Sequence, residues 1–458
     1  MRRTRLNLIA AGACGLLVAL APGAASGAAS GALKHVETEA HPALNNSNGV
    51  TVSRDGKSVY GVGFGGDSIG AFSRNANTGA ITFIEEENGN DLDAPEEIVV
   101  SADGKHAYVT GFGSNSIHAY SRSVTGALSF IEDEVDGASG VDGLAEAYSV
   151  IIARGGRDVY VTGLADNAIA LFHRNAANGS LQWSDAFING GEGISGLMAP
   201  RGIDASPDGK HIYAASSTGA GVVAFSRFSQ TGQLDFVEFE QIAATTSGVT
   251  VAPSGRRVYV ASNDGVRTYS RNATTGALTL IGHTTGPGDT QPLSLVHGLA
   301  VAPAGDNVYA NSGNITSGVA TLKQPAQGKL RYQEFDAGPG SSSDTAISAD
   351  GRHVYLSGGL GVNSAIAAYS RQHRLDVTGK RKQNAARLAV KAECSAGCKV
   401  TITGKGLKPA SKQLKAGVAK RVRIRLKGET PSAGRIVLKG KAKAGNRRAT
   451  DKFKVKLK

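Results

Sequence analysis

Long hydrophobic segments are almost absent from this sequence. The one extended apolar run lies between Leu6 and Leu20, after the charged residues Arg2, Arg3 and Arg5, and small residues follow it. This order is typical of a secretory signal peptide, so we expect residues 1–30 to be removed and the chain to be secreted. A retained membrane anchor is the alternative, although the run is short for a span. No later segment predicts a transmembrane helix.

Cysteine is also scarce, with three in 458 residues. Cys14 lies in the signal segment, where lipidation is a minor alternative, so Cys394 and Cys398 remain. Two cysteines three residues apart in an exported protein favour a local disulfide. A metal site is the weaker alternative, because no second cysteine pair and no nearby histidine complete a zinc set. We expect no metal and no cofactor.

Charge divides the chain into two parts. Residues 31–375 contain 22 basic and 34 acidic residues, a net charge of −12. Residues 376–458 contain 25 basic and 4 acidic residues, a net charge of +21. Such asymmetry indicates either a polyanionic partner or docking of one part on the other.

An internal repeat occurs seven times in the acidic part. Its most regular position is a tyrosine, at Tyr60, Tyr108, Tyr160, Tyr213, Tyr259, Tyr309 and Tyr355. The spacing of 46 to 53 residues is that of a β-propeller blade. We expect these tyrosines to pack between blades rather than to bind a ligand.

Each repeat predicts four short strands. In the first repeat they are residues 50–53, 59–62, 69–72 and 81–84, with a turn at Asp55-Gly56 and another at Thr78-Gly79. Similar glycine turns return in the later repeats, and Ser-Arg pairs such as Ser73-Arg74 close the third strand. We expect these pairs to cap or bridge strands on the outside.

The seventh repeat lacks a fourth strand, and a matching segment occurs at the start of the chain. Residues 33–39 resemble the fourth strand at residues 128–134. A circular array can complete its last blade in this way and so remove an exposed edge. The sequence therefore predicts an all-β, seven-bladed β-propeller over residues 31–375, closed by an N-terminal strand.

The repeats resemble a known family. Tyr108-Val109-Thr110-Gly111 and Tyr160-Val161-Thr162-Gly163 are similar to YVTN-type propeller repeats. The whole unit resembles the seven-bladed lactonase family, in which bacterial 6-phosphogluconolactonase is the named enzyme. The resemblance covers residues 33–373 and implies a propeller with ring-ester hydrolysis as a possible activity. In that family a Pro-His pair often enters the innermost strand; His297 matches the histidine, and Pro200 keeps the proline before Arg201.

One polar position varies from blade to blade. Aligned repeats place it where the chain enters each innermost strand, at Asn48, Glu96, Tyr148, Arg201, Ser247, His297 and Asp344. Propeller ligands usually bind at the central channel or its mouth, so this set is the predicted small-molecule site. Glu96 or His297 could act as general base and Arg201 could stabilise an oxyanion. Solvated rim residues are the alternative. We expect no nucleophile elbow, zinc-protease motif or phosphate-cradling loop.

The basic part predicts a separate small module. Residues 376–386 read as a linker, and residues 387–458 as a β-sandwich-like module, because residues 421–427 and 452–458 alternate basic and apolar side chains. Its cations could bind an anionic cell-envelope polymer or serve solubility alone. Phe453 is its one aromatic residue, so specific nucleic-acid binding is not expected.

Two functions of different class follow. The first is a secreted binding or scaffold protein, with a small molecule or a protein at the channel mouth and the basic module at an anionic envelope. The second is a secreted lactonase-like hydrolase that acts on a ring ester. A propeller dehydrogenase or metal lactonase is a third and weaker hypothesis, since no cofactor or metal motif supports it.

Overall fold

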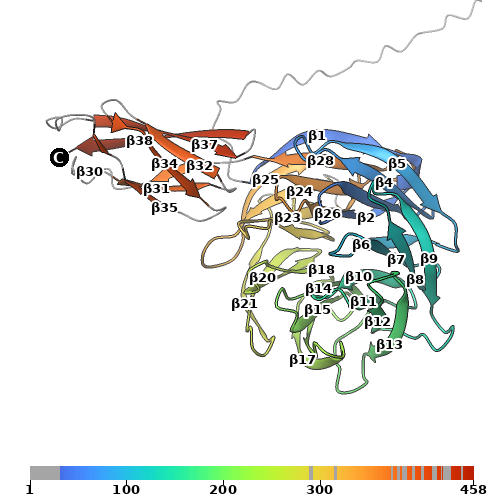
Figure 1. Cartoon of the computed structure of the whole chain (residues 1–458). Helices are drawn as coiled ribbons and strands as arrows, with labels where there is room; N and C mark the ends of the chain where they lie inside the picture. Colours follow the sequence, from blue (N-terminus) through green and yellow to red (C-terminus); the bar gives the residue numbers. More distant parts are fainter. Residues whose placement is uncertain are drawn as a thin grey trace, which may run out of the picture.

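The computed structural model describes residues 31–287, 292–313 and 317–372, and shorter stretches between residues 375 and 457. Its main body is a ring of seven four-stranded antiparallel sheets (Figure 1). The innermost strands are β2 (Ser47–Val52), β6 (Pro95–Val100), β10 (Ala147–Ile152), β14 (Pro200–Ala205), β18 (Thr246–Val251), β22 (Leu299–Val301) and β26 (Ser342–Ile347). The all-β propeller predicted from the repeats is confirmed.

The other strands of each blade follow outward in chain order. The second strands are β3 (Ser58–Gly63), β7 (His106–Gly111), β11 (Asp158–Gly163), β15 (His211–Ser216), β19 (Arg257–Ser262), β23 (Asn307–Ser312) and β27 (His353–Gly358). The third strands are β4 (Ser68–Arg74), β8 (Ser116–Arg122), β12 (Ala168–Arg174), β16 (Gly221–Arg227), β20 (Gly265–Arg271), β24 (Gly318–Lys323) and β28 (Ala365–Arg371). The outer strands are β5 (Ile81–Asn88), β9 (Leu128–Val135), β13 (Leu181–Ile188), β17 (Leu234–Gln241), β21 (Leu278–Thr284), β25 (Arg331–Ala337) and, from the N-terminus, β1 (Leu33–Ala40).

Neighbouring blades share their hydrophobic cores. One cluster joins Tyr60 and Val62 of the first blade to Ile98 and Val109 of the second. The second strands are buried on both faces, which explains their nearly continuous apolar sequence. The repeated tyrosines are fully buried in these clusters, so the prediction that they pack between blades is confirmed.

The arginine of the Ser-Arg pair connects blades rather than lying outside. Arg122, in the second blade, donates through Nε to the hydroxyl of Tyr60 in the first blade at 2.7 Å. The same tyrosine donates to the carbonyl of Gly126 at 2.7 Å. Most other blade junctions repeat this arrangement, for example Arg174 with Tyr108 at 3.0 Å. The expectation that the Ser-Arg pairs bridge strands on the outside holds for the serines, as Ser73 Oγ donates to the carbonyl of Thr82 at 3.2 Å on the exposed side. It was wrong for the arginines: they are buried clamps, because the tyrosine hydroxyl needs a partner inside the blade interface.

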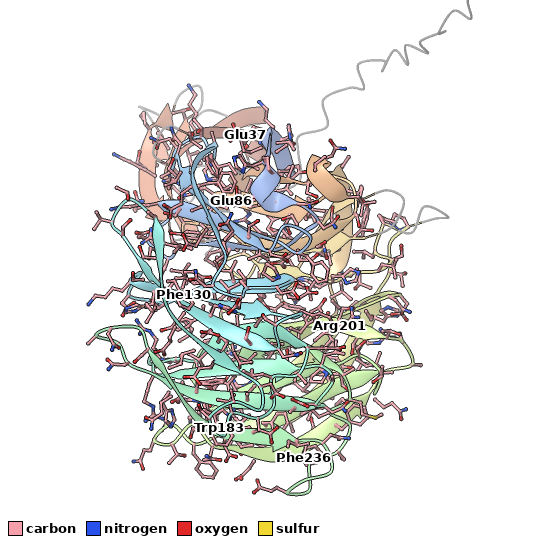
Figure 2. All side chains as sticks on the ribbon, turned by 90° about the vertical axis from the view of Figure 1, so that its right-hand side faces the viewer. Glu37, Glu86, Phe130, Trp183, Arg201 and Phe236 are labelled. Carbon is pink, nitrogen blue, oxygen red and sulfur yellow. The ribbon has the colours of Figure 1, made fainter. Side chains whose placement is uncertain are left out.

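The ring is closed by the N-terminal strand, as predicted. β1 pairs antiparallel with β28, in a register that places Leu33 opposite Arg371 and Ala40 opposite Ala365. The Glu37 carboxylate also accepts a hydrogen bond from the backbone N–H of Ile81 at 2.5 Å, which ties β1 to β5 of the next blade. Figure 2 shows Glu37 on β1 and Glu86 on β5 at this side of the ring.

Strands continue in the C-terminal part of the chain. They are β29 (Leu375–Thr378), β30 (Lys382–Gln383), β31 (Ala389–Cys394), β32 (Cys398–Thr403), β33 (Leu407–Lys408), β34 (Ala410–Leu414), β35 (Lys420–Arg423), β36 (Arg425–Leu426), β37 (Arg435–Ala444) and β38 (Arg447–Leu457). They form sheets in the orders β29-β31-β35, β30-β38-β37-β32-β34 and β33-β36. Strand pairing thus begins within the predicted linker. The domain boundaries and the sandwich-like packing stay predictions.

The disulfide also stays a prediction, because residues 395–397 and the side chains of Cys394 and Cys398 lie outside the described part. Within the residues that the structure describes, no helix has the length and apolar character needed to cross a membrane.

Candidate functional site at the channel mouth

Bulges at the start of the inner strands direct side chains into the channel. In β2, Ser47 pairs with Gly63 but Val50 pairs with Gly61, so Asn48 and Gly49 together oppose one residue. Five further inner strands shift register at the corresponding place. A bulge of this kind re-aims side chains that would otherwise alternate between faces.

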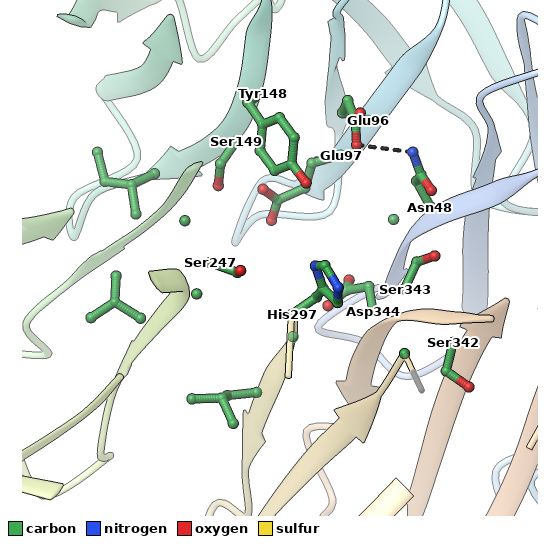
Figure 3. Close-up of a pocket in the computed structure, with 18 of the residues that line it drawn as sticks. Asn48, Glu96, Glu97, Tyr148, Ser149, Ser247, His297, Ser342, Ser343 and Asp344 are labelled. Atoms are coloured by element: carbon green, nitrogen blue, oxygen red, sulfur yellow. Dashed lines mark hydrogen bonds between the residues drawn. The ribbon is translucent and has the colours of Figure 1, made fainter. Parts of the chain in front are cut away.

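Glycine at the second bulged position lets the inner strands approach closely. A Cβ atom on Gly49 would lie 2.7 Å from the carbonyl oxygen of Glu96, and one on Gly248 would lie 2.2 Å from that of His297. The preceding residues instead project into a cavity of about 320 Å³, to which all seven blades contribute (Figure 3). The close strand packing and the ring of variable residues therefore define one cavity at the channel mouth.

Most of the site residues predicted from the sequence line the cavity. Its lining includes Asn48, Glu96, Tyr148, Ser247, His297 and Asp344. Arg201 lies beside the cavity rather than in its lining, with its guanidinium carbon 5.2 Å from the centroid of the Tyr148 ring. The sheet register also changes the alignment of the last blade. Ser342 pairs with Gly358 as Ser47 pairs with Gly63, so Ser343, not Asp344, corresponds to Asn48.

Glu96 is hydrogen-bonded to a predicted residue of the neighbouring blade. Its carboxylate accepts a hydrogen bond from Asn48 Nδ2 at 2.9 Å (Figure 3). Burial raises the pKa of Glu96 to about 7, although Arg201 and the Asn48 bond act in the opposite direction. Burial and the Arg201 charge lower the pKa of His297. Near neutral pH the Glu96 carboxyl group is therefore partly ionised, and the His297 imidazole in the same cavity is mainly uncharged.

Glu97 was missed by sequence reasoning and lies in the cavity next to Glu96. Its Oε2 accepts a hydrogen bond from the backbone N–H of Val150 in the next blade at 3.2 Å. Burial, reinforced by the nearby charge of Asp344, raises the pKa of Glu97 to about 8. The adjacent pair Glu96-Glu97 in a bulged strand start was the signal that could have revealed it.

Asp344 and Asp204 connect blades in the same way as Glu97. Asp344 Oδ2 accepts from the backbone N–H of Val50 at 3.1 Å, and Asp204 Oδ2 accepts from that of Val251 at 2.7 Å. Burial raises the pKa of both, that of Asp204 to about 6. Asp344 lines the cavity, whereas Asp204 does not.

Two other chemical possibilities lie elsewhere. The letters Gly-x-Ser-x-Gly occur at Gly66–Gly70, but Ser68 is buried at the start of β4 and donates to the Ala43 carbonyl at 3.1 Å. It lacks the exposed strand-to-helix turn of a nucleophile elbow. Among the described residues, one group of potential ligands has its donor atoms within 4.8 Å of one another, namely Asp136, Asp142 and Asp166. That site is empty.

The family model described as "Lactonase, 7-bladed beta-propeller" matches residues 27–151 and 149–291, which is more than half of the chain. The chain belongs to the seven-bladed β-propeller lactonase family. No curated protein matched this lactonase-family propeller.

Solved structures support the fold of this lactonase-family propeller. A periplasmic gluconolactonase from Pseudomonas aeruginosa is 17% identical, with a TM-score of 0.54 over 64% of this chain and 86% of its own. A candidate 6-phosphogluconolactonase from Bacteroides uniformis is 18% identical, with a TM-score of 0.53 over 63% of this chain and 84% of its own. Hydrazine synthase from Kuenenia stuttgartiensis is 18% identical, with a TM-score of 0.55 over 73% of this chain and 97% of its own. At these identities the likeness extends to the fold alone, and the function must be argued from the site.

Proposed function

We propose that this lactonase-family propeller is an exported binding protein that takes a small polar molecule into the cavity at the channel mouth. The observation that carries the proposal is the cavity itself: side chains of different chemistry, one or more from each of seven blades, converge on about 320 Å³. Residues that only held the ring together would tend to repeat from blade to blade, as the tyrosines do. A concave site with a few convergent polar groups is typical of a small-molecule site.

A blocking substitution tests this function. Ser247→Trp would fill the cavity from β18, whereas Ser129→Trp would add the same side chain on the exposed side of β9. Calorimetric titration with a panel of sugars, sugar lactones and amines should find a ligand that binds the unmodified protein and the Ser129→Trp protein. Binding should be lost in the Ser247→Trp protein. If both variants bind that ligand equally well, its site is not this cavity.

Ring-ester hydrolysis is a second candidate function, favoured by the position of Glu96 near Arg201. Glu96 would accept a proton from water, and the water oxygen would bond to the carbonyl carbon of the ester. Arg201 would stabilise the oxyanion; the ring C–O bond would then break, and the proton would pass to the departing alkoxide. The pKa of about 7 leaves a substantial fraction of Glu96 ionised at neutral pH.

The pH dependence tests this second candidate. Because the ionised carboxylate is the base, the hydrolysis of a δ-lactone should rise with pH through about 7. Glu96→Gln should lower the rate roughly 100-fold or more. An unchanged rate in Glu96→Gln would exclude Glu96 as the base.

We further propose that the C-terminal part holds the exported protein near an anionic cell envelope. The support is its net charge of +21 over residues 376–458, beside a propeller of net charge −12. Alternating strands such as β38 would leave rows of lysine and arginine on one face. Attraction of this kind needs no specific pocket.

A further inference from the structure

The buried carboxyl groups of the channel are not required by the ring. Glu97, Asp204 and Asp344 each accept a backbone N–H from the next blade, at three of the seven blade junctions. At the position of Glu97 and Asp344, four other blades carry Gly49, Gly202, Gly248 and Gly298. At those glycines the inner strands come together by close backbone contact, and at the junction of the fourth and fifth blades this contact accompanies the Asp204 hydrogen bond. A neutral acceptor could serve the same N–H group without the cost of burying a charge.

The cavity has too little positive charge to balance these groups. Glu96, Glu97 and Asp344 all line it, and the neighbouring Arg201 is stacked against the Tyr148 ring. No salt bridge between Arg201 and a carboxylate occurs among the described residues. The remaining polar lining consists of neutral groups, mainly serines, Asn48 and Tyr148. An anionic ligand such as a phosphorylated sugar would therefore be repelled by each of these carboxyl groups that is ionised.

Two of the three carboxyl groups that line the cavity, those of Glu97 and Asp344, are far apart in the sequence. Glu97 belongs to the second blade and Asp344 to the seventh, yet both line the same cavity, and the charge of Asp344 helps to raise the pKa of Glu97. Figure 3 shows both directed into the same space, near Tyr148 and His297. Among the described residues, the group of three potential metal ligands with donor atoms within 4.8 Å of one another lies elsewhere, at Asp136, Asp142 and Asp166.

We infer that the cavity takes a ligand that carries a protonated amine, with the ammonium group held between the carboxylates of Glu97 and Asp344. This inference rests on the proposed small-molecule site and names its ligand class. An ammonium group has three N–H donors, so it can donate to both carboxylates at the same time. Its positive charge would stabilise the ionised form of Glu97, whose pKa of about 8 leaves it mostly protonated at neutral pH without a ligand. Tyr148, Ser247 and Asn48 remain to bind hydroxyl or amide groups of the same ligand.

Titration of the full-length protein with 1,4-diaminobutane and with its neutral analogue 1,4-butanediol tests the inference. The diamine should bind at least about tenfold more tightly than the diol, since it makes charge-assisted hydrogen bonds. Glu97→Gln and Asp344→Asn should each weaken diamine binding about tenfold or more. Both amides keep an oxygen that can accept the N–H of the next blade, so the ring should remain folded. Asp204→Asn is the matched control, because Asp204 bridges blades in the same way but lies outside the cavity lining.

The outcomes separate the ligand class from the site. If a neutral sugar or lactone binds and Ser247→Trp blocks it, but the diamine does not bind, the ammonium inference is wrong and the small-molecule site survives. If Asp204→Asn weakens diamine binding as much as Glu97→Gln does, the effect is general charge attraction and the inference also fails. Tight binding of Ca²⁺ or Mg²⁺ that Glu97→Gln abolishes would replace the amine with a metal ion. If no compound of the panel binds, both proposals fail.

Discussion

At the scale of single residues, the blade clamp shows how substitutions compensate one another. The arginine of one blade usually meets a turn aspartate of the preceding blade, as Arg271 meets Asp208 at 2.9 Å. Where the turn aspartate is replaced by Gly155, Asp158 supplies the carboxylate to Arg227 instead. At the junction of the fifth and sixth blades the arginine is replaced by Gln324, whose Oε1 accepts a hydrogen bond from the Tyr259 hydroxyl at 2.8 Å, and the turn aspartate is replaced as well, by Ser254. Charge is thus kept balanced at each junction, because an unpaired buried charge is costly.

Histidines in the clamp predict a loss of stability in acid. His106 and His211 are buried beside Arg174 and Arg271, and burial together with the arginine charge lowers the pKa of each below its usual 6.5. As the pH falls below about 6.5, these histidines become protonated in the unfolded chain before they do so in the folded protein. Protonation therefore favours the unfolded chain and lowers the free energy of unfolding in acid, whereas above about pH 6.5 this destabilisation is absent. The sixth blade carries Asn307 at this position, with Arg371 Nη2 3.4 Å from its oxygen.

The double variant His106→Asn and His211→Asn should lose less unfolding free energy between pH 7.5 and pH 5.5 than the unmodified protein. Urea unfolding of both proteins at several pH values measures this difference in unfolding free energy. The cavity carboxylates are the same in both proteins, so their contributions cancel. His35→Asn, on the exposed part of β1, is the control and should leave the pH dependence unchanged. Parallel curves for the double variant and the unmodified protein would contradict the assigned role.

At the scale of strands, the repeat was predictable and the local register was not. Tyrosines, glycine turns and a missing fourth strand predicted the seven blades and the closure by β1, because each blade must bury the same faces. Asp344 was aligned one residue away from its true equivalent, Ser343, and Glu97 was missed. Both errors have one cause: a bulge places two consecutive residues toward the channel, whereas simple alternation predicts only one.

Removing the closing strand should destabilise the whole ring. A protein that lacks residues 31–40 would expose the edge of β28 and lose the Glu37 bond to the next blade. We expect a fall in the thermal unfolding midpoint, with one cooperative transition. A synthetic peptide of residues 31–41 should restore part of the lost stability by adding a strand. An unchanged midpoint after the deletion would show that β1 does not close the ring.

At the scale of the whole molecule, the two oppositely charged parts predict salt-sensitive binding. The full-length protein should bind an anionic polymer at low salt and release it at high salt, since the Debye length falls from about 10 Å at 0.1 M to about 3 Å at 1 M. A chain that ends at Arg374 should not bind, which a sedimentation assay with a polyanionic resin can measure. Equal binding by both proteins would exclude the C-terminal part as the anchor. Tight binding by the isolated C-terminal part alone would show that the propeller masks it.

The central claim is that the variable polar residues at the channel mouth serve a ligand and not the fold. Its most direct test is the thermal unfolding of a triple variant in which Glu96, Arg201 and His297 are all replaced by alanine. None of the three belongs to the Tyr–Arg clamps or to the hydrophobic clusters that join the blades. We expect a midpoint within about 2 °C of that of the unmodified protein, since a stability change of 1 kcal/mol would move the midpoint of a ring of this size by roughly that amount. A fall of about 8 °C or more would show that these residues hold the ring together, and the claim would be wrong.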